Sequence, residues 1–119
     1  MKTAETEADV QQTLCEWLRI RRVRYFAVPN GAILGGYNRY AQISRLKRTG
    51  LMTGAPDLVL IDRAPNTGRP VVIEVKRARG CRLSSAQTAA STMFDRAGWH
   101  YIVAWGFDSG VNQCIRLGY

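Results

Sequence analysis

Two hydrophobic periods divide the chain into helices and strands. Between residues 4 and 20, apolar side chains recur every three or four positions, which predicts a helix with one buried face; they are Val10, Leu14, Trp17 and Leu18. A second helix is expected over Tyr37–Arg48, and a third begins at Ser84 or Ser85 and ends at Gly98. The inner stripe of the third helix is expected to comprise Ala86, Ala89, Ala90, Met93, Phe94 and Ala97.

Runs of β-branched and aromatic residues predict four strands. They cover Val23–Val28, Asp57–Ile61, Val71–Val75 and Trp99–Trp105. The second and third strands flank a turn-rich loop around Pro65 and Asn66, so we expect them to form a hairpin. The tail over Phe107–Leu117 is expected to be a short helix or irregular. The predicted order is α-β-(α)-β-β-α-β, which indicates an α/β fold.

Length and composition favour one domain over residues 1–119, because 46% hydrophobic residues in 119 suffice for a single core. Seventeen Lys and Arg against nine Asp and Glu give a formal net charge of +8. This excess favours a polyanionic partner such as nucleic acid, although a basic surface also serves solubility alone. Composition therefore indicates a class of partner and leaves the reaction open.

The cysteines and the N-terminus indicate an intracellular protein without a membrane segment. Cys15, Cys81 and Cys114 are odd in number and form no C-x-x-C pair, which argues against a disulfide framework and a zinc site. Residues 1–12 are too polar for a signal peptide, and no apolar run approaches the ~18 residues that a membrane span needs.

Two carboxylates and one ammonium are predicted to meet in the hairpin. Asp57 opens one strand and Glu74 closes the next, and the two positions are symmetric about the point between Pro65 and Asn66. A symmetric hairpin places them opposite each other, with Cβ atoms about 5 Å apart, where like charges repel. Lys76 shares the face of Glu74, because strand side chains alternate. A divalent cation with hard oxygen ligands would relieve the repulsion.

Each of these residues also has a purely structural interpretation. Asp57 could cap a turn, and Glu74 could pair with Lys76 on a solvated face. Together these interpretations are weaker, because Glu74 follows the β-branched run Val71–Ile73 in what reads as a central strand, where charges are rare.

Two further polar residues remain open between structure and function. Glu7 occupies the N-terminal end of the first helix's apolar stripe, where it could face the same site or complement the helix dipole. Gln87 follows Ser84 by three residues, which is the spacing of a capping box.

The motif resembles a known nuclease signature. Gly54-Ala55-Pro56-Asp57, sixteen intervening residues and Glu74-Val75-Lys76 are similar to the PD-(D/E)xK pattern. The surrounding residues, in the same order, resemble the VRR-NUC (virus-type replication-repair nuclease) family from about Glu5 to Trp105. They are Glu7 with Gln11, Pro29-Asn30-Gly31, Gly50-Leu51, and Leu83-Ser84 with Gln87.

This resemblance implies a restriction-endonuclease-like core, a mixed β-sheet flanked by helices. It implies a catalytic set and a metal set for Mg²⁺ or Mn²⁺. The catalytic set is Asp57, Glu74, Lys76 and Gln87; the metal set is Asp57, Glu74, the Val75 carbonyl and Glu7. In the catalytic set Lys76 would orient or activate water for hydrolysis of a phosphodiester, and Gln87 belongs to the active-site region as an alternative to capping alone.

DNA is the expected substrate. Basic residues on either side of the motif are candidate contacts to the DNA backbone; they are Arg45, Lys47, Arg48, Arg77, Arg79 and Arg82. No base-reading motif is evident, so we expect recognition of branched DNA by its structure. Stand-alone family members resemble phage Holliday-junction resolvases, which implies a homodimer encoded by a phage or prophage. The alternatives are a flap, end or nonspecific nuclease with a helicase partner, and a DNA-binding module without catalysis.

Overall fold

The computed structural model describes residues 5–29 and 38–119 and contains four helices and four strands within these ranges. In chain order the elements are α1 (Glu7–Ile20), β1 (Tyr25–Ala27), α2 (Arg39–Arg48), β2 (Leu58–Leu60), β3 (Val71–Lys76), α3 (Ser85–Arg96), β4 (His100–Trp105) and α4 (Phe107–Arg116). The predicted α/β class and mixed sheet are confirmed, with α4 as a regular helix at the end of the predicted order.

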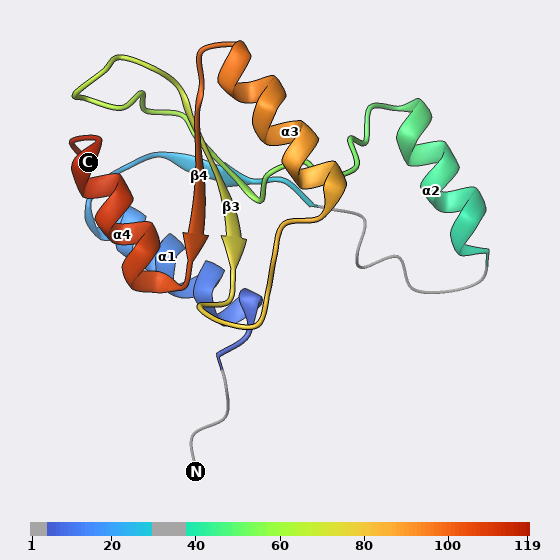
Figure 1. Ribbon diagram of the computed structural model, residues 1–119, viewed down its shortest axis with the longest axis horizontal. Coiled ribbons are helices and arrows are strands. Elements are labelled where there is room, and N and C mark those ends of the chain that lie inside the picture. Colours follow the sequence, from blue (N-terminus) through green and yellow to red (C-terminus); the bar gives the residue numbers. More distant parts are fainter. Residues whose placement is uncertain (1–4, 30–37) are drawn as a thin grey trace.

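The sheet has the strand order β1-β2-β3-β4, with β3 in its interior (Figure 1). β1, β2 and β3 pair antiparallel, and β3 pairs parallel with β4 after the chain crosses over through α3. The predicted hairpin register is confirmed, because Leu58 pairs with Ile73 and Leu60 with Val71. Continued by one residue, this register sets Asp57 opposite Glu74.

Alternation along β3 sends its side chains to two different surroundings. Val71, Ile73 and Val75 belong to the main hydrophobic core. There they meet α1 and α4, which contribute the buried residues Val10, Leu14, Leu18 and Cys114. The other three side chains, Val72, Glu74 and Lys76, project from the opposite face, which α3 covers. Because every residue of β3 is buried, Glu74 and Lys76 are charged groups inside the fold.

Helix α3 rests on the sheet through a narrower stripe than predicted. Only Ala90 is buried, and Met93 is 60% exposed. Phe94 makes the aromatic contacts of this helix, with the rings of Trp99 and Tyr101. The prediction of a broad inner stripe that included Ala89, Met93 and Ala97 was wrong. The helix contacts β4, the edge strand of the sheet, and most of its residues are exposed.

Helix α2 stands apart from the sheet, beyond α3, and contains no buried residue (Figure 1). It begins after Asn38, whose side chain accepts a hydrogen bond from the Ala41 N–H. Tyr37, and Asn30 and Gly31 of the family-like motif, lie outside the described residues. Within the described part of the chain, no helix has the length and apolar character needed to cross a membrane.

Candidate active site

Asp57 is held against β3 by both its main chain and its side chain. Its N–H donates to the Ile73 carbonyl at 3.0 Å, and its carbonyl accepts from the Val28 N–H at 2.8 Å. Its Oδ2 atom accepts from the Val75 N–H at 2.7 Å. The carboxyl group therefore takes a main-chain donor of β3 and is fixed beside Glu74.

Glu74 is the most deeply buried charged residue of the site, with 2% of its surface exposed. One carboxyl oxygen, Oε1, accepts a hydrogen bond from Gln87 Nε2 at 2.6 Å. The other, Oε2, is buried and accepts no hydrogen bond from the described residues. A buried carboxyl oxygen without a donor is costly, which makes this atom a natural place for a cation.

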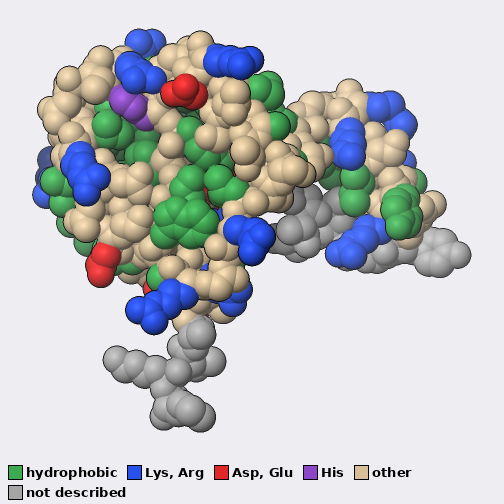
Figure 2. All heavy atoms as spheres, viewed as in Figure 1, with side chains coloured by type: hydrophobic (Ala, Val, Ile, Leu, Met, Phe, Trp, Pro, Cys, Tyr) green, Lys and Arg blue, Asp and Glu red, His purple; other side chains and the backbone are tan. Residues whose placement is uncertain are grey.

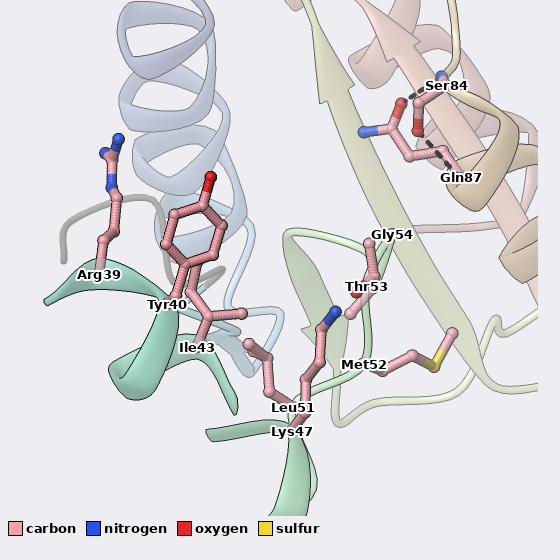
Figure 3. A pocket seen from close by; sticks show the side chains of 11 residues that line it. Arg39, Tyr40, Ile43, Lys47, Leu51, Met52, Thr53, Gly54, Ser84 and Gln87 are labelled. Atoms are coloured by element: carbon pink, nitrogen blue, oxygen red, sulfur yellow. Dashed lines mark hydrogen bonds between the residues drawn. The ribbon is translucent and has the colours of Figure 1, made fainter. Parts of the chain in front are cut away.

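Gln87 both caps α3 and contacts Glu74, so the two interpretations of this residue are compatible. Its Oε1 accepts from the Ser84 N–H at 2.9 Å, and its own N–H donates to Ser84 Oγ at 3.1 Å (Figure 3). This capping box uses the amide oxygen. The amide nitrogen is therefore the group presented to Glu74.

Burial and mutual repulsion dominate the electrostatics of the pair. Burial, followed by the negative charge of Asp57, raises the pKa of Glu74 to about 8, while the Lys76 ammonium opposes the shift. Burial also raises the pKa of Asp57, against the Val75 N–H bond that favours its charged form. When no cation is present, both shifts favour the protonated forms of these carboxyl groups.

Lys76 and Glu7 meet at the end of β3. The Lys76 ammonium lies 4.0 Å from Glu7 Oε1, with its side chain 10% exposed and that of Glu7 48% exposed. Cys81 Sγ also donates to Glu7 Oε1, at 3.8 Å. The charge of Glu7 contributes to the raised pKa values of both Asp57 and Glu74. Glu7 thus lies at the exposed rim of the site.

The donor set suits a small hard cation with few protein ligands. Within residues 5–29 and 38–119 there is no group of three or more His, Cys, Asp or Glu side chains arranged to hold a metal ion. Mg²⁺ is commonly held by one or two carboxylates, with waters and substrate phosphates as further ligands. Asp57 and Glu74, with the unpartnered Oε2 atom, fit that pattern.

Tyr101 belongs to these surroundings, and the sequence reasoning missed it. Its hydroxyl is buried without a hydrogen-bond partner among the described residues. Burial, together with the charges of Glu74 and Asp57, raises the pKa of this hydroxyl. Tyr101 belongs to β4, which pairs parallel with β3. Local sequence does not reveal this pairing, so Tyr101 could be assigned to the site only once the strand order was known.

The predicted DNA-contacting residues form two groups, and all of them are exposed. Arg77, Arg79 and Arg82 follow Lys76 in the segment that leads to α3; Arg45, Lys47 and Arg48 lie on α2. Figure 2 shows Lys and Arg side chains over α2. A pocket of about 820 Å³ extends from α2 to Gln87, with Lys47 in its wall (Figure 3).

Gly54 lets the loop before Asp57 pack directly on the start of α3. Its φ is +82°, and a Cβ atom there would lie 2.5 Å from the Ala86 carbonyl carbon and 2.8 Å from the Gln87 nitrogen. No side chain fits this space. The loop that leads to Asp57 therefore packs against the first turn of α3. That turn carries Gln87, which donates a hydrogen bond to Glu74.

We expect Gly54→Ala to destabilise the fold more than Gly50→Ala. Both glycines have positive φ, so each alanine costs about 1–2 kcal/mol in backbone strain. Only Gly54 adds a clash with α3, worth a further ~1–3 kcal/mol. Urea unfolding of the two variants measures the difference. Equal losses would show that the loop does not press on α3.

The metal-free protein should lose stability between pH 5 and pH 8. A folded-state pKa of about 8 for Glu74 exceeds the unfolded value of 4.5, so the folded state binds more protons and is destabilised as the pH rises. The loss should be on the order of a few kcal/mol, because the shift spans several pKa units and each unit is worth ~1.4 kcal/mol. Urea unfolding in EDTA measures it.

Glu74→Gln should remove most of this pH dependence and be more stable than the parent at pH 8. Glu16→Gln, the same change at an exposed position of α1, is the matched control and should keep the parental slope. A Glu74→Gln variant with the parental slope would contradict the assignment.

A comparison with solved structures supports this architecture. Comparisons with protein-family models and with curated proteins found no match. Among solved structures, a "VRR_NUC domain protein" superposes with a TM-score of 0.73 at 23% sequence identity, over 98% of this chain and 93% of the other. The chain therefore has the fold of a VRR_NUC domain protein along nearly its whole length.

Proposed function

We propose that the chain is a VRR-NUC nuclease that hydrolyses DNA phosphodiester bonds with the help of Mg²⁺ or Mn²⁺. The observation that carries the proposal is the carboxylate pair Asp57–Glu74 beside Lys76 on a VRR_NUC fold. One buried oxygen of Glu74 has no donor among the described residues. A purely structural role explains the pair poorly, because two buried carboxylates side by side destabilise the fold.

Asp57, Glu74 and the Val75 carbonyl are the proposed metal ligands. Glu7 adds a further carboxylate at the exposed rim of the site. When bound, the cation offsets the repulsion of the carboxylates and stabilises negative charge on the phosphate oxygens during hydrolysis. Val75 donates to Asp57 Oδ2 and Gln87 donates to Glu74 Oε1, so Glu74 Oε2, which has no donor among the described residues, is the oxygen that would bind the cation.

The remaining residues position the substrate and water. Lys76 places a positive charge beside the scissile phosphate and orients the water that attacks phosphorus. Its ammonium is held near the carboxylates by burial of its side chain and by Glu7. Gln87 fixes the position of the Glu74 carboxyl group by its hydrogen bond and affects hydrolysis through that group. The exposed arginines after β3 and on α2 bind the DNA backbone on either side.

Branched DNA is the proposed substrate, cut by a homodimer in the manner of a Holliday-junction resolvase. No recognition-helix motif is evident in the sequence, and the exposed basic residues suit phosphate contacts. Two symmetric incisions in a four-way junction require two active sites, which a two-fold dimer supplies.

Asp57→Asn and Glu74→Gln should each reduce DNA cleavage in Mg²⁺ by at least about a hundredfold, because each removes a ligand charge that stabilises the transition state. Binding of DNA in EDTA should persist. Cleavage is measured by gel assay, with Glu16→Gln as the control that keeps parental activity. Parental cleavage by either site variant would refute the proposed site, and metal-independent cleavage would refute the role of the cation.

A panel of substrates tests the proposed preference. In Mg²⁺ or Mn²⁺, four-way junctions should be cut faster than linear duplex, by paired incisions at symmetric positions. Sedimentation of the protein with its junction should give two chains per complex. Preferred cutting of flaps or of free ends would replace the resolvase assignment with the flap or end nuclease, and equal cutting of every DNA would indicate a nonspecific nuclease.

A further inference from the structure

A pocket lies between α2 and the loop that leads to Asp57. Its volume is about 820 Å³, and its walls include Arg39, Tyr40 and Lys47 of α2, Leu51 and Met52 of the loop, and Gln87 of α3. Figure 3 shows Arg39 and Tyr40 projecting from the same turn of α2, while the Lys47 side chain extends toward the loop. We refer to this space as the α2 pocket.

The lining of the α2 pocket combines an aromatic ring, apolar side chains and positive charge. Tyr40 is 89% exposed, so its ring is not used to build the fold. Among the described residues that line the pocket there is no Asp or Glu. Exposed aromatic rings next to Arg and Lys are the means by which proteins bind unpaired nucleotides, with the base stacked on the ring.

The α2 pocket also has the right size and position for one nucleotide. Its volume falls in the range of about 300–1,000 Å³ that holds small organic ligands. Gln87 lines it and, through the same side chain, donates to Glu74 at 2.6 Å. One side chain thus separates the pocket from the carboxylate pair. A nucleotide in the pocket would be a near neighbour of the phosphate at the active site.

We propose that the α2 pocket holds an unpaired nucleotide of the DNA strand that is cut, with its base on Tyr40 and its phosphate near Arg39 and Lys47. This inference rests on the proposed function, because it names the feature by which that site selects its DNA. A base within continuous duplex must first be unpaired and unstacked, which costs free energy. A nucleotide already unpaired at a branch, gap or flap enters without that cost.

A second copy of this chain is the competing occupant of the same surface. Helix α2 carries four basic residues and no acidic residue in its sequence RYAQISRLKR. Two such helices packed together would repel each other, whereas a nucleic-acid strand complements their charge. The observed chemistry therefore favours DNA over self-association at this helix.

Fluorescence anisotropy in EDTA tests the α2 pocket without any cleavage. The two probes are a labelled duplex interrupted by a short single-stranded gap and a continuous duplex of the same length. Tyr40→Ala should weaken binding of the gapped probe about tenfold, because stacking of one base is worth ~1–3 kcal/mol. Binding of the continuous duplex should change less than twofold. Tyr40→Phe, which keeps the ring, should bind like the parent.

Ile115→Ala is the matched control, because it removes another exposed hydrophobic side chain, from α4 on the other face of the sheet. It should leave both affinities unchanged. A 2-aminopurine placed in the gap gives a second signal: its fluorescence should be quenched by the parent and by Tyr40→Phe, and not by Tyr40→Ala.

Two results would overturn the inference. Equal weakening of both probes by Tyr40→Ala would make the residue a general DNA or folding contact, and a change in oligomeric state on sedimentation would make it a dimer contact. Because these measurements use no metal and no cleavage, they fail independently of the nuclease assignment. If the protein stacks the gap base but cleaves no DNA, the assignment of the α2 pocket stands and the nuclease assignment is rejected.

Discussion

The central constraint on this molecule is the placement of two carboxyl groups side by side at an interior strand of its sheet. Repulsion and burial both work against the pair, and the surrounding groups limit the cost in separate ways. Val75 donates its N–H to Asp57, and Gln87 donates its amide to Glu74. Lys76 opposes the rise in the pKa of Glu74. One carboxyl oxygen still has no donor among the residues that the structure describes, and the proposed cation would bind there.

The fold around this pair is arranged so that each contact comes from a different element. The pairing of β2 with β3 brings the carboxylates together. The first turn of α3 supplies the Gln87 amide, and α1 supplies Glu7 at the rim of the site. Gly54 links two of these elements, since only a residue without a side chain lets the Asp57 loop lie on α3. The candidate site is therefore formed where several elements meet.

The parts that sequence predicted well depend on short-range pattern. The β2–β3 register followed from β-branched runs placed symmetrically about Pro65 and Asn66, and it positioned the carboxylates correctly. The parts that it missed depend on packing between distant segments. The parallel place of β4 brings Tyr101 to the site, and the edge position of α3 exposes Met93. No local pattern records either arrangement, because both depend on which neighbours are present.

The loop between β2 and β3 joins the two strands, and their pairing aligns Asp57 with Glu74. A change in loop length that preserves this pairing would leave the alignment of the two carboxylates unaltered. A slip of one residue inside either strand would turn a carboxylate to the opposite face. The geometry of the carboxylates thus depends on the phase of each half of the motif within its strand, and depends on the interval between the halves only through the strand pairing.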